Sequence, residues 1–315
     1  MDASSRVIDD HDELRALALD ALPTRPAHET VLLVEPTHFD LAYAINPHMD
    51  GEVDRERARV QWEHLRETLE RAGADVRVLD PDETARELGD AGPDPADRPD
   101  MVFVANHAVP TADGTGLVLA RMATDERAGE PEHLRVWAER AGYRVAEPPA
   151  VAFEGTGDAL WHPGRRLLWG GYGFRTDRAA YDDLADRLDA TVVPLELVDD
   201  RYYHLDVALA PLSETTALVQ PAAFTDEGLA KIRAGFETVL AAPTDESAEQ
   251  LAVNLVVVGE TAVTSAEIPE TAALLSDAGF DVVAVDTGEF LKAGGSVFCL
   301  TLSLGTPPAP SDQRR

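Results

Sequence analysis

A helix-like stretch, a turn and a short run of β-branched residues recur five times along this chain. The five segments are RAGADVRVLD from Arg71, RAGYRVAEPP from Arg140, RLDATVVPLE from Arg187, RAGFETVLAA from Arg233 and DAGFDVVAVD from Asp277. Four of them carry a glycine where a helix C-cap requires a left-handed backbone, namely Gly73, Gly142, Gly235 and Gly279; Asp189 takes that place in the third. This recurrence predicts an α/β fold, either an ordinary sheet with repeated helix-to-strand joints or a fold of five repeats.

Eight further apolar runs lie between these segments and predict strands. They cover residues 31–35, 101–105, 117–121, 166–170, 207–210, 216–220, 251–258 and 296–302. Each unit therefore consists of strands, a helix and a closing strand. We interpret residues 1–28 as an N-terminal helical extension, residues 29–304 as the main domain and residues 305–315 as a disordered tail.

Acidic residues dominate the charge of the chain, with 58 acidic against 27 basic residues and a formal net charge of −31. Only Lys231 and Lys292 are lysines. A chain this acidic repels nucleic acid and anionic membranes, so we expect neither as a partner. Scattered acidic residues with almost no lysine are typical of proteins that stay soluble in high salt, which predicts a halophilic source.

The sequence also predicts a cytoplasmic location. No apolar run approaches 18 residues, so no transmembrane helix is expected. The N-terminus begins with acidic residues and lacks the basic and apolar regions of a secretory signal. The single cysteine excludes an internal disulfide. The sequence leaves the oligomeric state open.

That single cysteine, Cys299, follows a glycine pair in KAGGSVFCLTLSL (292–304). A cysteine in an apolar run is often a small core residue, but the glycines allow a ligand to approach the backbone closely. A reactive thiol needs a base. His204 is the candidate, with Asp206 on the same face of an extended segment as its orienting carboxylate. A pair of metal ligands is the weaker interpretation, so we expect no metal.

Residues 152–177 form the segment richest in polar groups set among glycines. Glu154 and Asp158 precede an apolar run, and carboxylates in such a place suit a planar cation. Arg175 follows a glycine-rich stretch and is suited to bind a carboxylate through two hydrogen bonds, although it is equally placed to cap a helix. Asn106 in VFVANHAVP (102–110) is placed at a strand end, where a simple turn residue is the alternative.

Together these motifs resemble the guanidino-group-modifying superfamily, which includes arginine deiminases, dimethylarginine dimethylaminohydrolases, arginine dihydrolases and amidinotransferases. The matching stretches are EPTHFDLAYAINPHM (35–49), FVANHA (103–108), FEGTGDAL (153–160), GYGFRTD (171–177), HLD (204–206) and the strand ending in Cys299. Their shared order is specific, because His204 follows Glu154 by 50 residues and Cys299 follows His204 by 95. The resemblance implies a pseudo-symmetric, five-bladed α/β propeller (pentein) of ββαβ units.

The resemblance also implies catalytic roles. Glu154 would hold the guanidinium nitrogens, and His204, oriented by Asp206, would shuttle protons. Cys299 would attack the guanidinium carbon to form a covalent thiouronium that water hydrolyses, with no cofactor. The substrate would be arginine or an Nω-methylated arginine.

The remaining implied roles concern substrate binding. Arg175 and Arg127 would hold the substrate's α-carboxylate, and Phe39 and Asp40 would form part of the entrance. Asn106 stands where deiminases have an aspartate, in a context that resembles the arginine dihydrolases. An amide both donates and accepts hydrogen bonds, so a neutral ureido group would be retained and hydrolysed to ornithine, ammonia and carbon dioxide. Citrulline formation, amidino transfer and an inactive arginine-binding relative are the alternatives.

Overall fold

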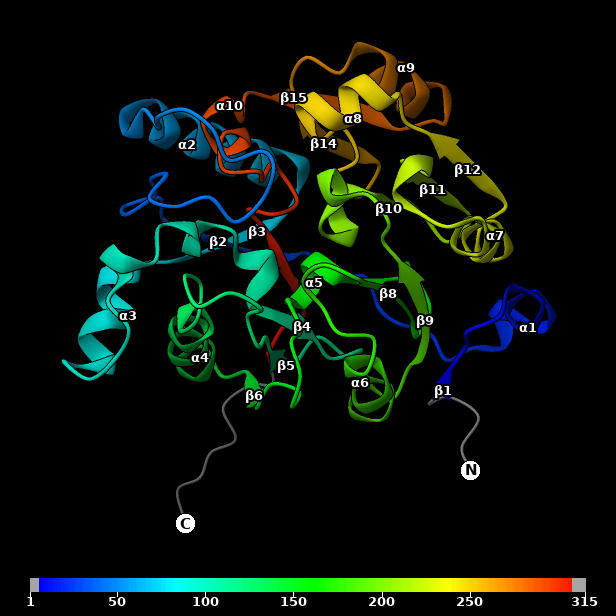
Figure 1. Cartoon of the computed structure of the whole chain (residues 1–315), viewed down its shortest axis with the longest axis horizontal. Coiled ribbons are helices and arrows are strands. Elements are labelled where there is room, and N and C mark those ends of the chain that lie inside the picture. The colour runs from blue at the N-terminus through cyan, green and yellow to red at the C-terminus, as the bar shows by residue number, and fades with distance from the viewer. Residues whose placement is uncertain (1–5, 308–315) are drawn as a thin grey trace.

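The strands of this protein form five separate sheets of one design, as a computed structural model describes them for residues 6–307. In each sheet a short first strand pairs antiparallel with a second, and a helix then leads to a third strand that runs parallel to the second. Figure 1 shows these sheets arranged around the middle of the molecule, with helices towards the outside. The mixed α/β fold predicted from the sequence is therefore confirmed.

The sheets are numbered by the order in which their helices occur along the chain. The first holds β16 (Leu302–Leu304), β2 (Thr30–Val34), α2 (Arg55–Ala72) and β3 (Asp75–Leu79). The second holds β4 (Ala108–Pro110), β5 (Gly116–Leu119), α4 (Glu130–Arg140) and β6 (Arg144–Ala146). The third holds β7 (Ala159–Trp161), β8 (Leu167–Tyr172), α6 (Ala180–Leu188), β9 (Thr191–Glu196) and the added edge strand β1 (Arg6–Val7).

The fourth sheet holds β10 (Leu209–Pro211), β11 (Thr216–Val219), α7 (Asp226–Gly235) and β12 (Thr238–Ala241). The fifth holds β13 (Val256–Val258), β14 (Thr261–Ser265), α9 (Pro269–Asp277) and β15 (Asp281–Val285). Shorter helices lie between them: α1 (His11–Ala16), α3 (Pro81–Leu88), α5 (Gly155–Asp158), α8 (Thr244–Gln250) and α10 (Gly288–Leu291).

The first sheet joins the two ends of the domain. Leu302 of β16 pairs antiparallel with Leu32 of β2, and Val31 pairs in parallel with Val76 of β3. Both neighbours of β2 therefore bind it through backbone hydrogen bonds, and its five residues are all buried. The last residues of the domain are thereby held against the first strand.

Four of the five predicted helix caps have the left-handed backbone that the sequence indicates. Gly73 and Asp189 cap α2 and α6 with φ values of 106° and 49°. Gly142 and Gly279 also have positive φ, at 92° and 94°. The prediction is wrong at Gly235, where α7 ends without a left-handed residue. A side chain there would clash with the Trp169 indole, so this glycine serves close packing instead.

Two predicted strands are wrong, and a third, predicted over 251–258, is a strand only at Val256–Val258. Residues 101–105 lie in the 3-10 helices Pro99–Val102 and Val104–His107, and most of residues 296–302 form turns before β16. Both segments are apolar and buried, and a short apolar run does not distinguish a buried strand from a buried turn. This difference matters because Asn106 directly follows the first segment and Cys299 lies in the second.

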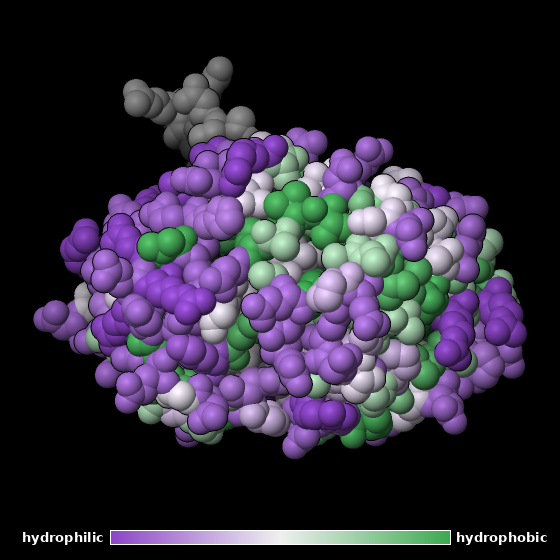
Figure 2. Space-filling view, turned by 90° about the horizontal axis from the view of Figure 1, so that it is seen from above, coloured by the Kyte–Doolittle hydropathy of each residue, from purple (hydrophilic) through white to green (hydrophobic). Residues whose placement is uncertain are grey.

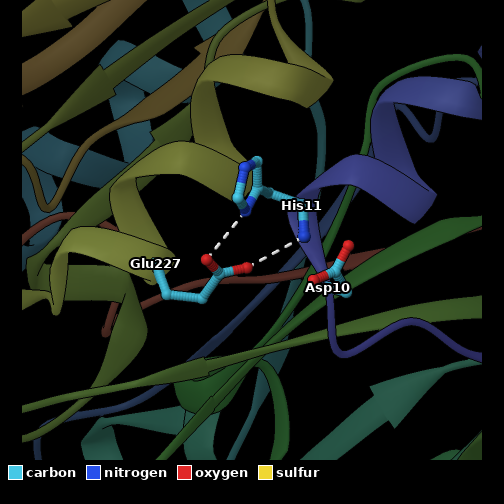
Figure 3. Close-up of side chains that lie close together, drawn as sticks. All are labelled: Asp10, His11 and Glu227. Atoms are coloured by element: carbon cyan, nitrogen blue, oxygen red, sulfur yellow. Dashed lines mark hydrogen bonds and ion pairs between the residues drawn. The ribbon is translucent and has the colours of Figure 1, made fainter.

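The N-terminal segment is anchored to the third and fourth sheets. Strand β1 pairs in parallel with β9, and α1 lies against α7. Figure 3 shows the contact, in which the His11 backbone N–H donates to Glu227 Oε1 and the His11 imidazole binds Oε2 at 2.7 Å. The predicted extension at 1–28 thus contains a short helix and a strand within its described residues. Its boundary stays a prediction, as does the tail, most of which lies outside the described residues.

The surface is largely hydrophilic on the face shown in Figure 2. Figure 2 shows polar and charged side chains over most of one face, with apolar side chains gathered in patches between them. Within residues 6–307, no helix has the length and apolar character needed to cross a bilayer.

One cavity is bordered by residues from the first strand of every sheet in the described chain. It touches Pro110 of β4, Leu160 of β7, Leu209 of β10, Val256 of β13 and Ser303 of β16. We call it the strand-lined cavity. The first strands of all five described sheets therefore border the same cavity.

Candidate active site

Each sheet contributes a polar side chain from the few residues that precede its first strand. Asn106 precedes β4, Glu154 precedes β7, Asp206 precedes β10, Asn254 precedes β13 and Cys299 precedes β16. The backbone at Gly155 allows the segment before β7 to approach the segment before β4 closely. Gly155 has a φ of 56°, and a Cβ on it would lie 2.6 Å from the Ala105 carbonyl oxygen. All five polar side chains are at least nine-tenths buried.

A small cavity lies beside these segments, of about 240 Å³ with the open space at its mouth included, and we call it the cysteine cavity. The polar side chains on its wall are Asn46, Asp100, Asn106, Arg127, Arg175, Tyr203 and Cys299. Two buried arginines among them favour an anionic group such as a carboxylate. Burial raises the pKa of Asp100 to about 7, which weakens the negative charge on that side of the cavity.

Cys299 is held by two polar side chains. Its Sγ–H donates to Asp206 Oδ2 at 3.2 Å, and Asn254 Nδ2 donates to the sulfur at 3.1 Å. Asn254 Oδ1 also accepts from the backbone N–H of Phe298 and of Cys299, which fixes the turn that carries the thiol. Burial, reinforced by the neighbouring Asp206, raises the pKa of the Cys299 thiol well above its ordinary value. The sulfur therefore carries its proton in the free protein at neutral pH.

Glu154, and not Asp206, is the partner of His204. His204 Nε2 lies 2.7 Å from Glu154 Oε2, and the predicted orientation of His204 by Asp206 is not found. The reason is local: residues Leu205–Val207 form a 3-10 helix, so the side chains do not alternate as they would in a strand. Burial by itself would raise the pKa of Glu154, but the hydrogen bond and charge of His204, with the charge of Arg175, outweigh it and lower the pKa to about 2.

Arg175 also contacts Glu154. Its Nη1 donates to Glu154 Oε2 at 3.1 Å, its Nη2 donates to the Ile45 carbonyl at 2.8 Å, and its guanidinium lies over the Tyr203 ring at 4.9 Å. The sequence did not indicate Tyr203, whose hydroxyl donates to the Gly294 carbonyl. The structure therefore brings a guanidinium onto the carboxylate that the sequence assigned to a guanidinium substrate.

Arg127 fixes the orientation of Asn106. Arg127 binds Glu130 through Nε and Nη2, and its Nη1 donates to Asn106 Oδ1 at 2.8 Å. Because a guanidinium only donates, the amide oxygen must face Arg127, and Nδ2 faces away from it. Asn106 Nδ2 is buried, has no partner among the described residues and lies beside Gly157 and His204.

The other predicted residues lie farther from the cysteine cavity. Asp158 accepts from Thr176 Oγ1 at 2.7 Å and from the Leu205 backbone N–H at 3.0 Å, so it positions the chain next to His204. Phe39 is buried against Phe290 and Phe103, and Asp40 forms an ion pair with Arg55 on the surface. Neither Phe39 nor Asp40 lines this cavity, and their place at the substrate entrance stays a prediction.

Asp206→Asn is expected to make Cys299 react faster with iodoacetamide. Burial raises the pKa of Asp206 to about 7, so the carboxylate is negative above that pH and opposes formation of the thiolate. An asparagine removes this charge and therefore lowers the pKa of the thiol. Mass spectrometry should find slow alkylation of the wild-type protein at pH 8, rising with pH through 9, and faster alkylation of the variant. Equal rates at every pH would contradict this account.

A family model described as N,N-dimethylarginine dimethylhydrolase, eukaryotic, matches residues 35–305. The chain belongs to the dimethylarginine dimethylaminohydrolase family. Its matched region includes the cysteine cavity and all five segments that precede the first strands. The resemblance inferred from the motifs is confirmed.

The relatives with a named activity include two kinds of enzyme. An N(G),N(G)-dimethylarginine dimethylaminohydrolase of Mycobacterium tuberculosis is 38% identical over 281 residues, which cover 89% of this chain and 87% of that protein. The bifunctional arginine dihydrolase/ornithine cyclodeaminase ArgZ of Synechocystis sp. is 35% identical over 89% of this chain. The match covers 38% of ArgZ, so this chain corresponds to well under half of that longer protein.

Solved structures from both groups resemble this chain. The ArgZ N-terminal domain in a cysteine-to-serine form, bound to substrate, superposes with a TM-score of 0.80 at 35% identity, over 88% of this chain and 98% of that one. A dimethylarginine dimethylaminohydrolase adduct has the same fold with a TM-score of 0.73 at 22% identity, over 88% of this chain and the whole of that one.

Proposed function

We propose that this protein hydrolyses the guanidinium group of arginine or an Nω-methylated arginine through a covalent thiouronium on Cys299. The observation that carries the proposal is the cysteine cavity, where the thiol lies on the same wall as Asn106, Arg127 and Arg175. His204 and Glu154 form a buried acid–base pair next to it. The two groups of relatives hydrolyse such substrates by name, which supports the same class of reaction.

Substrate binding would exchange one guanidinium for another. In the free protein the Arg175 guanidinium forms an ion pair with the Glu154 carboxylate. The substrate guanidinium would take that place, and the released Arg175 would bind the substrate's α-carboxylate. Glu154 then keeps a cationic partner throughout, which avoids an unpaired buried charge.

The chemistry follows from the state of the thiol. A substrate cation beside Cys299 lowers the pKa of the thiol, so the thiolate forms where it is used and the thiol proton passes to Asp206, which accepts from Sγ. Sγ attacks the guanidinium carbon, the carbon–nitrogen bond breaks, and His204 supplies the proton with which ammonia or a methylamine leaves. Water then attacks the same carbon, the carbon–sulfur bond breaks, and citrulline is released.

We further propose a second hydrolysis, which converts citrulline and water to ornithine, ammonia and carbon dioxide. The support is Asn106, whose Nδ2 has no partner among the described residues while Oδ1 is occupied by Arg127. A free donor suits the oxygen of a ureido group better than the N–H groups of a guanidinium. In ArgZ, a cysteine and an asparagine are the residues changed to serine in the solved mutant forms, and they are separated by the same number of residues as Cys299 and Asn106.

Mass spectrometry of the products tests this function. The purified protein is incubated in high salt with arginine, monomethylarginine, dimethylarginine or agmatine. We expect ornithine from arginine. Accumulation of citrulline without ornithine would reject the second hydrolysis and favour a dimethylargininase-like reaction. Failure to convert any of the four compounds would favour an inactive arginine-binding relative, and transfer of the amidine to an added amine would favour amidino transfer.

Asn106→Asp is expected to shift the product from ornithine to citrulline. A second carboxylate beside Glu154 favours the cationic substrate over the neutral ureido group, so citrulline would leave before it is hydrolysed. We expect the ornithine-to-citrulline ratio to fall about tenfold or more, since loss of one hydrogen bond costs roughly 1 kcal/mol and added repulsion increases this. Asn46→Asp is the matched control, because it makes the same change on the same cavity. An unchanged ratio in Asn106→Asp would contradict this role.

The five sheets support a further proposal for the architecture, namely five blades of a pseudo-symmetric propeller of ββαβ units. They share one strand order, and their first strands border the same strand-lined cavity. On this proposal residues 29–304 form the catalytic domain, and the segments that precede the first strands meet at one end of its axis.

A further inference from the structure

The strand-lined cavity is separate from the cysteine cavity and larger than it. It measures about 1520 Å³ out to its open mouth. Its inner wall is mainly aliphatic and aromatic, with Leu209, Val253, Leu255 and Phe298 among its residues. Concave sites with apolar walls and a few polar groups are the usual form of small-molecule binding sites in proteins.

Arg25 lies in this cavity without an anionic partner among the described residues. Its Nε is buried without a hydrogen bond, and its guanidinium lies over the Trp161 ring at 5.0 Å. No carboxylate of residues 6–307 pairs with it, although Glu29 lines the same cavity and the chain carries 58 acidic residues. The backbone N–H of Arg25 donates to the Gly164 carbonyl at 3.0 Å, which holds the residue beside the cavity. Burial lowers the pKa of Arg25 to about 10, so it remains a cation at neutral pH.

His28 adds a second polar group to the same cavity. Its Nε2 is buried and has no partner among the described residues. Burial, followed by the charge of Arg25, lowers the pKa of His28 to about 4 even though Asp113 acts in the opposite direction. The neutral imidazole can donate one hydrogen bond from Nε2. A partly buried cation and an unpaired imidazole nitrogen on one cavity are polar groups that an anion would satisfy.

We propose that the strand-lined cavity is a second binding site, for an aliphatic monocarboxylate. The carboxylate pairs with Arg25 and accepts from His28, and the aliphatic chain lies along Leu209, Val253 and Leu255. A charged guanidinium and a carboxylate form strong, paired hydrogen bonds, while the apolar wall selects against small inorganic anions. A basic or neutral ligand of the same shape would leave Arg25 unpaired.

A ligand in the strand-lined cavity would contact residues that surround the nucleophile, Cys299. Phe298 and Asp206 both line the strand-lined cavity, and both belong to the group that holds Cys299. The Phe298 N–H is bound by Asn254, which also donates to the Cys299 sulfur, and Asp206 accepts from that sulfur. Asp206 Oδ1 is buried without a partner among the described residues. A ligand against Phe298 therefore changes the reactivity of the Cys299 thiol.

Calorimetric titration of the full chain with hexanoate tests the site, at constant ionic strength and pH 7.5. The Cys299→Ser protein is used with arginine present, so that the cysteine cavity is occupied. We expect one hexanoate per chain, and binding of 1-hexanol that is weaker roughly tenfold to a hundredfold, the usual range for a hydrogen bond to a charged group. Arg25→Gln should weaken hexanoate binding by a similar factor, while Arg233→Gln, at an exposed arginine, should leave it unchanged.

Two results would overturn the proposed site. They are hexanoate binding no tighter than hexanol binding, and equal hexanoate affinity in Arg25→Gln and the wild type. The link to the nucleophile is tested separately by the rate at which iodoacetamide modifies Cys299 in the wild-type protein. Hexanoate should change that rate in proportion to its occupancy, and should have no effect in Arg25→Gln at the same concentration. Binding without a change in the rate would overturn the link.

Discussion

A Cys299→Ser protein is expected to bind arginine and to lose turnover by roughly a thousandfold or more, as nucleophile replacements do in covalent enzymes. A serine hydroxyl ionises far less readily than a thiol, and among the described residues no base contacts this position directly other than Asp206. The hydroxyl still donates to Asp206 and accepts from Asn254, so the fold should be preserved. Product formation by mass spectrometry measures the loss.

The same variant separates binding from chemistry. Intact-protein mass spectrometry should find a transient adduct on the wild-type chain during turnover and none on Cys299→Ser. Thr301→Ser, at a buried hydroxyl two residues further along the turn, is the control for damage to this segment. Turnover by Cys299→Ser at the wild-type rate would rule out the covalent mechanism.

Glu154→Gln is expected to reduce both stability and activity strongly. Glu154 Oε2 accepts from His204 and Arg175, and Oε1 accepts from the Ala123 N–H. A glutamine carries no charge, and its NH₂ group must face one of these donors. Breaking a buried charge pair by removal of one partner typically costs about 3–5 kcal/mol. Urea denaturation at pH 7.5 should find a loss of this size, and the turnover of arginine should fall at least a hundredfold.

The pH dependence of this difference has a defined sign. The pKa of Glu154 is depressed in the folded protein to about 2, below its unfolded value near 4.3. The stabilisation by its charge is therefore fully present above pH 4.3 and disappears as the pH falls towards 2. The stability gap between wild type and Glu154→Gln should shrink below pH 4. Glu227→Gln, at a partly exposed carboxylate paired with His11, should cost less than about 1 kcal/mol.

The residues proposed for catalysis come together through contacts that the sequence predicted only in part. Cys299, His204, Glu154 and Asn106 lie in neighbouring segments, as the order of the motifs indicated. Their partners differ: His204 pairs with Glu154, Asp206 pairs with Cys299, and Arg127 binds an amide instead of lying free for a substrate.

Asn254 was missed because nothing in its local sequence marks it. It stands in an apolar run, VNLVVV, where a single asparagine looks like a turn residue. One signal could have found it: every other sheet carries a site residue shortly before its first strand, and Asn254 holds that position in the fifth sheet. A repeat inferred from helix caps does not show this, because the caps lie at the other end of each unit.

The sequence by itself determined the α/β class, the repeated helix–turn–strand units and the set of polar residues that carry the chemistry. These follow from local physical effects, namely left-handed caps, β-branched strands and unusual polar residues beside glycines. The tertiary structure alone decided which polar group meets which, and which apolar runs became turns. Asn106, Glu154, Asp206, Asn254 and Cys299 are 45 or more residues apart from one another along the chain. Contacts over that distance depend on how the five sheets pack, and no local propensity specifies them.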